Sequence, residues 1–117
     1  MTEARIVLTT IDDPERARSL ARALVERGLA ACVNIVDRVH SVYRWQGAVE
    51  TAEELLLVIK TVASHVEPLE QAIRELHSYA LPEFVVLPVD AAAPEYLRWI
   101  TSSTQPGTQF GTSSNEE

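Results

Sequence analysis

The chain has 117 residues, an apolar fraction of 46% and a formal net charge of −7, which together indicate one acidic domain with enough apolar residues for a core. Its basic residues are almost all scattered arginines. A nucleic-acid-binding face is therefore not expected, because phosphate binding requires clustered Lys and Arg. No apolar run is long enough to span a membrane, and Met1–Arg5 does not resemble the start of a signal peptide. With Cys32 as the single cysteine, these observations predict a cytoplasmic protein without disulfides.

The first elements predicted along the chain are a short strand and an amphipathic helix. Residues 5–10 (RIVLTT) form a β-branched run that is typical of a strand. Asp12, Asp13 and Pro14 then supply a helix start, with an acidic cap and a proline in the first turn. Apolar residues recur at helical spacing up to Gly28, which ends the helix as a C′ glycine.

The stretch from Gly28 to Thr61 predicts a long β-hairpin, because it is dense in β-branched and aromatic residues and shows no helical reading. Its turn is expected at Gln46-Gly47, where a glycine supplies a positive φ, and a bulge or bend is expected at Asp37-Arg38. The hairpin is longer than one small domain needs to cover its core. That surplus is the first indication of function.

The rest of the chain predicts a helix, a loop, a strand and a final helix. Ser64 to Glu67 has the spacing of a capping box, although Pro68 points to a cap one or two residues later. A loop follows at residues 77–82, and residues 84–89 form an edge strand, because Pro88 cannot donate a ladder hydrogen bond. Pro94 begins the final helix.

These elements follow the order βαββαβ with a C-terminal helix, which predicts an α+β, ferredoxin-like domain over residues 1–101. Both helices are expected on one face of an antiparallel sheet. Little in the sequence covers the other face, so another subunit is the simplest candidate to cover it. Residues 102–117 are polar and low in complexity and are predicted to form a disordered tail.

Several segments resemble the divalent-cation tolerance (CutA) family, in the same order along residues 4–100. They are GLAACVNI (28–35), SVYRWQG (41–47), EELLLVIKT (53–61), HSY with LPE (77–83), LPV (87–89) and YLRWI (96–100). The resemblance implies a ferredoxin-like protomer in a compact homotrimer, whose long hairpin extends between subunits and joins their sheets. It also implies a role in tolerance of copper and other divalent metals, and an architecture similar to that of the trimeric PII signalling proteins.

Three departures from the family pattern affect the site that the resemblance implies. Ser78 and Ala80 stand where the family loop reads Pro and Glu, so one family carboxylate is missing. Residues 90–94 replace a glycine that is common before the final Tyr-Leu. Thr9 and Thr10 stand where some members carry a cysteine, which weakens any copper site based on that thiolate.

His77 and Glu83 are the candidate metal ligands, because imidazole and carboxylate suit borderline divalent ions. Their spacing matches no recognised motif, so folding or a neighbouring subunit must bring the ligands together. The alternative for His77 is a loop held by hydrogen bonds. Cys32 is a candidate soft ligand, with a buried structural cysteine as the alternative. No cofactor is expected to be required beyond an optional divalent metal, copper.

Five residues are candidates for a small-molecule cleft between subunits: Lys60, Tyr43, Trp45, Tyr79 and Glu83. Lys60 ends an apolar strand and is expected to help bind a small anion or metabolite there, or alternatively to form an interface salt bridge. Tyr43 and Trp45 alternate on one strand face, which also suits anchors of a subunit interface.

The sequence contains no Gly-rich phosphate loop, no Ser-His-Asp signature and no HExxH motif, so nothing in it specifies an enzyme. The leading hypothesis is a homotrimer of the CutA family that acts in divalent-metal tolerance by weak metal binding, without catalysis. The alternative is a PII-like trimer that signals by binding a small molecule between subunits. A third hypothesis is a scaffold whose trimer is itself the function.

Overall fold

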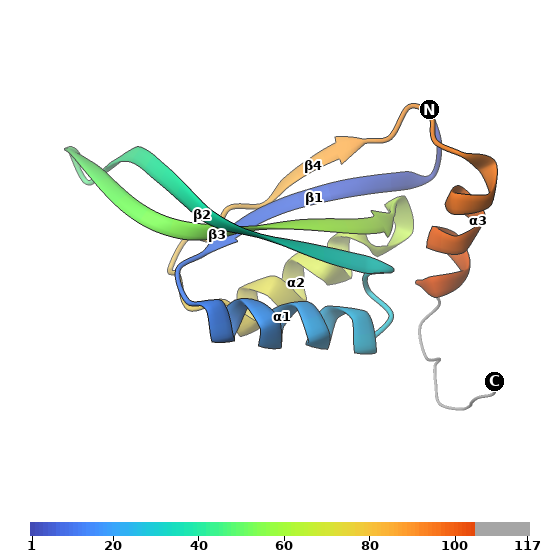
Figure 1. Ribbon diagram of the computed structural model, residues 1–117, viewed down its shortest axis with the longest axis horizontal. Coiled ribbons are helices and arrows are strands. Elements are labelled where there is room, and N and C mark those ends of the chain that lie inside the picture. The colour runs from blue at the N-terminus through green and yellow to red at the C-terminus, as the bar shows by residue number, and fades with distance from the viewer. Residues whose placement is uncertain (105–117) are drawn as a thin grey trace.

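The computed structural model describes residues 1–104, and Figure 1 shows them as a sheet with helices on one side. The elements are β1 (Ala4–Ile11), α1 (Pro14–Glu26), β2 (Cys32–Trp45), β3 (Ala48–Val62), a 3-10 turn (Ala63–His65), α2 (Val66–Leu76), β4 (Val85–Pro88) and α3 (Pro94–Ser103). The strand order is β2-β3-β1-β4, and every neighbouring pair is antiparallel. This arrangement is the predicted ferredoxin-like α+β fold, and β4 lies at the edge as Pro88 required.

The start of α1 is capped by Asp13, whose side chain accepts hydrogen bonds from the amides of Glu15 (2.8 Å) and Arg16 (3.4 Å). Pro14 occupies the first turn, and Gly28 follows the helix with a φ of +73°. These features confirm the predicted helix. Because Asp13 is the cap, the carboxylate of Asp12 is not needed for this role.

The capping box predicted for α2 is wrong. His65 is the N-cap and makes no side-chain capping bond, and the hydroxyl of Ser64 pairs with Nδ1 of His65 at 3.0 Å instead. The expected shift of the cap by one residue is confirmed. Pro68 is tolerated because it is the third residue of the helix, where the backbone N–H has no intrahelical partner.

The main core lies between the sheet and the pair of helices α1 and α2, which cover the same face of it (Figure 1). Val7, Leu57 and Ile59 project from the sheet and are completely buried, as are Leu24 of α1 and Leu69 of α2. A second, smaller cluster packs α3 against the end of the sheet, and it contains Ala4, Ala31, Val62 and Ile100.

The opposite face of the sheet has no covering layer among residues 1–104. Its apolar side chains are cross-strand partners and therefore point the same way: Ile6 with Leu87, Leu8 with Val85 and Val58, and Leu56 with Val36. Val36, Val85 and Leu87 are 44%, 44% and 42% exposed. A continuous apolar sheet face of this kind is typical of an interaction surface.

The β2–β3 hairpin extends beyond the rest of the sheet (Figure 1). Its turn has φ angles of +50° at Gln46 and +85° at Gly47, as a two-residue primed turn requires. The predicted irregularity at Asp37-Arg38 is a β-bulge that shifts the register between Val36 and Val39, with a φ of +63° at Arg38. The strand begins at Cys32, later than predicted, because the amides of residues 29 and 30 still bond to the carbonyl of Leu24.

The C-terminal helix extends two residues past residue 101, where the predicted domain ends. α3 continues to Ser103, and the buried hydroxyl of Thr104 donates to the carbonyl of Ile100 at 2.9 Å. Residues 105–117 of the predicted disordered tail lie outside the described residues. In the part of the chain that is described, every helix is too short or too polar to cross a membrane.

Candidate binding groove

A groove of about 850 Å³ lies at the base of the hairpin. One wall is formed by the halves of β2 and β3 that are nearest the hairpin turn, and the other by the loop at residues 79–85 with the end of β1. The lining side chains that matter for its chemistry are Asp12, Tyr43, Trp45, Glu54, Tyr79 and Glu83.

Glu54 is the buried acid of this groove, with only 8% of its surface exposed. Its Oε1 accepts a 2.5 Å hydrogen bond from the hydroxyl of Ser41, and its Oε2 accepts a 2.6 Å bond from the phenol of Tyr79. Both donors are neutral. Within residues 1–104, no Lys, Arg or His lies within salt-bridge distance of this carboxylate. A buried carboxylate without a positive partner is costly and favours any ligand that brings one.

His77 holds the loop in place from beneath the groove. Its buried ring places Nε2 2.6 Å from the carbonyl oxygen of Thr10, and its Nδ1 accepts a 3.1 Å bond from the amide of Tyr79. These partners require a neutral ring with its proton on Nε2. The ring also packs against the ring of Tyr79, with centroids 4.6 Å apart. His77 is therefore a positioning residue for Tyr79.

The phenol of Tyr79 is kept protonated by its surroundings. Partial burial, the hydrogen bond to Glu54 and the negative charges of Glu54 and Asp12 all raise its pKa above the ordinary value. Tyr79 thus stays a hydrogen-bond donor to Glu54 over the physiological pH range.

The groove is acidic throughout. Asp12, Glu54 and Glu83 line it, and none of the described lining residues is Lys, Arg or His. Asp12 and Glu83 are exposed, so only Glu54 is withdrawn from water. The potential in the groove therefore favours cations over anions.

Four of the five residues predicted for a cleft lie together here: Tyr43, Trp45, Tyr79 and Glu83. Within one chain Lys60 does not join them, and its place in a cleft between subunits stays a prediction. It lies six residues beyond Glu54 on the same strand, which is about 20 Å at the rise of a β-strand. Its ammonium group bonds to Oδ1 of Asn34 at 2.6 Å.

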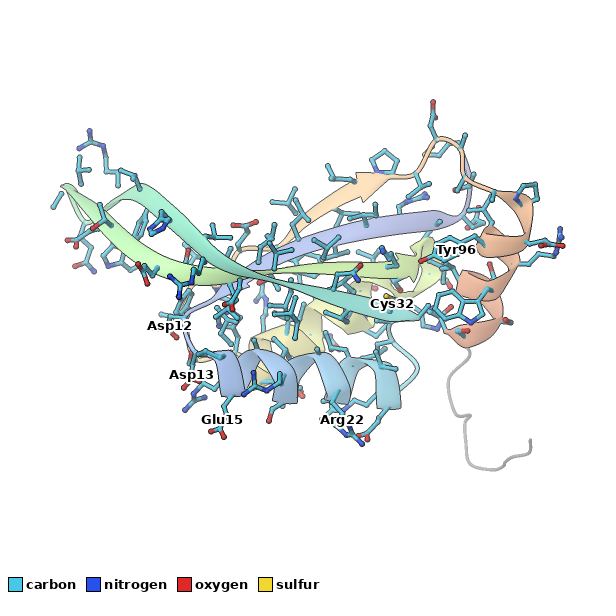
Figure 2. All side chains as sticks on the ribbon, in the orientation of Figure 1. Asp12, Asp13, Glu15, Arg22, Cys32 and Tyr96 are labelled. Atoms are coloured by element: carbon cyan, nitrogen blue, oxygen red, sulfur yellow. The ribbon has the colours of Figure 1, made fainter. Side chains whose placement is uncertain are left out.

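The structure separates the predicted metal ligands from one another. Glu83 lines the groove, His77 lies beneath it with both ring nitrogens in hydrogen bonds, and Cys32 pairs across the sheet with Lys60. Figure 2 shows Cys32 near α3, at the opposite end of the sheet from Asp12. Among residues 1–104, no three His, Cys, Asp or Glu side chains are arranged to hold one ion. A role of His77 or Cys32 as a metal ligand stays a prediction.

Sequence reasoning missed Asp12, Ser41 and Glu54. A signal for Glu54 was present, because it precedes the apolar run at alternate spacing with Leu56 and Val58 and so shares their face of β3. Asp12 was taken for part of the helix cap. Ser41 carried no local signal, because only the register of the hairpin brings it to Glu54.

The chain matches the family model described as "CutA1 divalent ion tolerance protein" over residues 5–103. It is 46% identical over 99 residues to the "Divalent-cation tolerance protein CutA" of Thermus thermophilus, which covers 85% of this chain and 96% of that protein. A solved Thermus thermophilus structure of that description has 45% identity, a TM-score of 0.84 and coverage of 86% and 97%. The CutA structure from Xylella fastidiosa has 38% identity, a TM-score of 0.87 and coverage of 89% and 100%. These findings confirm the resemblance inferred from the sequence.

The comparisons correct the expected location. A CutA structure from Archaeoglobus fulgidus, with 29% identity and a TM-score of 0.84 over 87% of this chain and 99% of that one, is named periplasmic. An Arabidopsis thaliana relative, 41% identical over 100 residues, is named chloroplastic, and this chain spans only 55% of its length. These names contradict the prediction of a cytoplasmic protein, because related proteins are named for other compartments.

Proposed function

This chain belongs to the CutA1 divalent ion tolerance protein family, and we propose that it contributes to tolerance by binding divalent metals, copper included, weakly and without catalysis. The observation that supports this proposal most directly is the groove. It presents three carboxylates and no basic side chain among the described lining residues. Carboxylate oxygens are ligands for divalent cations, and an acidic groove raises the local concentration of such ions.

The geometry of a single chain favours weak binding. The carboxylates of Asp12 and Glu83 are exposed, and Glu54 already accepts two hydrogen bonds. Residues 1–104 offer no ready set of three close ligands. A tighter site therefore needs a neighbouring subunit to complete the ligand set.

We further propose that the working form is a homotrimer. The uncovered apolar face of the sheet supports assembly, because Val85 and Leu87 at its edge are 44% and 42% exposed in one chain. The protruding β2–β3 hairpin supports it too, since its length exceeds what the protomer needs.

Calorimetric titration with Cu(II) tests the metal proposal. The double substitution Asp12→Asn/Glu83→Gln removes two exposed carboxylates from the groove and is expected to weaken binding about tenfold. The matched control Glu3→Gln/Glu95→Gln makes the same change of charge at two exposed residues that do not line the groove, and it is expected to bind as wild type. Equal binding by both double variants would exclude the groove. Binding that persists in Asp12→Asn/Glu83→Gln but is lost in His77→Ala would assign the ligand role to His77.

A further inference from the structure

The outer side of α1 carries a group of arginines on an otherwise acidic protein. Arg16, Arg18 and Arg22 lie within two turns of this helix and line one shallow hollow of about 930 Å³. Ile35 of β2 also lines it, because it pairs with the core residue Leu57 and so points to the helix side of the sheet. Figure 2 shows Arg22 pointing away from the sheet. The hollow is therefore separate from the apolar sheet face proposed for assembly, which lies on the other side.

The guanidinium groups of this hollow keep free hydrogen-bond donors. Within residues 1–104, no carboxylate lies within salt-bridge distance of Arg16 or Arg18. Arg22 bonds to Glu26 at 3.1 Å through Nε, and that bond does not use its two terminal nitrogen atoms. A guanidinium group presents its N–H donors as a planar fork that matches the oxygens of a phosphate or a carboxylate. The hollow therefore offers donors to an oxyanion.

Two carboxylates line the same hollow without cancelling this charge. Asp13 is the helix cap, and its Oδ1 accepts hydrogen bonds from two backbone amides, so the positive end of the helix dipole compensates its charge. Glu15 is exposed. Even without Arg22, whose charge Glu26 balances, two unpaired arginines face the one carboxylate of Glu15. The protein's net charge of −7 acts from further away, and salt screens it over about 10 Å.

Ser19 lies in the hollow, three residues after Arg16 and three before Arg22, so both arginines are its neighbours on the helix surface. Its exposed hydroxyl can donate to an anion. A phosphate monoester carries about −1.5 to −2 charges and three acceptor oxygens, which suit several donors better than the two oxygens of a carboxylate do. We propose that this hollow binds a small phosphate monoester, with the phosphoryl group at Ser19 and the organic group against Ile35.

This site goes beyond the proposed function, because it shares no residue with the groove. Titration of the protein with n-butyl phosphate, followed by ³¹P NMR at about 0.1 M salt, tests it. A saturable change of the phosphorus signal is expected. Inorganic phosphate is expected to bind about threefold more weakly, because it has no group to cover Ile35. n-Butyl sulfate has one charge, and it is expected to compete about tenfold less well than unlabelled ester.

Substitution of the arginines locates the site. Arg16→Gln/Arg22→Gln is expected to weaken binding of n-butyl phosphate by about tenfold or more. The matched control Arg74→Gln/Arg98→Gln makes the same change of charge at exposed helix residues that do not line the hollow, and it is expected to bind as wild type. Arg74 resembles Arg22 closely, since each bonds to a glutamate one helical turn away at 3.1 Å.

Glu15→Gln gives an expectation of the opposite sign, which a loss of structure would not produce. It removes the carboxylate that opposes the ligand and is expected to strengthen binding about two- to threefold. Equal affinity in the two double arginine variants, or no gain in Glu15→Gln, would overturn the proposal. Equal affinity for inorganic phosphate and n-butyl phosphate would overturn the assignment of an ester. Cu(II) binding in the groove involves none of these residues, so each proposal can fail without the other.

Discussion

The phenol of Tyr79 and the carboxylate of Glu54, 25 residues apart in the sequence, are joined by a 2.6 Å hydrogen bond. The bond ties the loop before β4 to the middle of β3, and so fixes the two walls of the groove relative to each other. His77 supports it from behind, because its Nδ1 accepts the amide hydrogen of Tyr79. The shape of the groove therefore depends on a short chain of polar contacts around one buried acid.

Removal of this bond is expected to destabilise the protein. Tyr79→Phe leaves Oε2 of Glu54 without its donor in a buried position, which is expected to lower the free energy of unfolding by about 1–2 kcal/mol. Urea denaturation at one fixed protein concentration measures the change. Tyr96→Phe on α3 is the control, with an expected change within about 0.5 kcal/mol. Equal losses in both variants would show that the bond contributes little.

Alkaline pH is expected to lower the free energy of unfolding through the ionisation of Tyr79. Because the pKa of Tyr79 is raised on folding, the folded chain keeps this proton at pH values where the unfolded chain has lost it. The contribution of Tyr79 to the free energy of unfolding is therefore constant below about pH 10 and falls as the pH rises above it. Phenolate absorbance should show a late-titrating component in wild type that is absent from Tyr79→Phe. An identical titration curve, scaled to the number of tyrosines, would contradict this.

The bulge residue Arg38 is expected to tolerate glycine better than its neighbours in the strand. A φ of +63° is unfavourable for arginine and unstrained for glycine, so Arg38→Gly is expected to raise the free energy of unfolding by up to about 1 kcal/mol. Arg44→Gly makes the same replacement in a regular part of β2 and is expected to lower it by about 0.5–1 kcal/mol. Thermal denaturation of both variants provides the comparison, and a loss of equal size in both would argue against strain at the bulge.

The uncovered sheet face is expected to hold the oligomer together. Leu87→Lys places a charge on this face and is expected to shift the protein from trimer to monomer in light scattering after size exclusion. Val25→Lys on α1 is the matched control, since both residues are 42% exposed in the protomer. A stable trimer in Leu87→Lys would show that the subunit interface lies elsewhere. A monomeric wild-type protein would exclude the trimer.

The fold was predictable because its signals are local. Asp13-Pro14 and Gly28 delimit α1, Gln46-Gly47 makes the turn, and Pro88 marks the edge strand, each through the conformation of its own backbone. The capping box at Ser64 failed because the 3-10 turn gives that side chain a closer partner in His65. The Ser64–Glu67 spacing matches a capping box, but the hydroxyl of Ser64 bonds to His65 instead of to a backbone amide of the helix.

The groove was only partly predictable, because it depends on distance along a strand and on register. Tyr43, Trp45 and Glu83 came from family segments that folding does bring together. Lys60 was grouped with them in a cleft between subunits, whereas within one chain the rise of β3 carries it to the other end of the sheet. Glu54 was overlooked because a glutamate in a strand is usually exposed, whereas this one is enclosed by Ser41 and Tyr79.

The bulge at Arg38 also determines which residues of β2 point to which face of the sheet. Before it, even-numbered residues such as Val36 pair with even-numbered residues of β3 such as Leu56; after it, odd-numbered residues take their place, beginning with Val39 opposite Glu54. A regular ladder through this point, with all residues of β2 retained, would turn Tyr43 and Trp45 to the opposite side. In β2, residues before the bulge, such as Val36, therefore form part of the uncovered apolar face, and Tyr43 and Trp45 after it form the aromatic wall of the groove. Substitutions in one of these two segments can thus occur in evolution without changing the other.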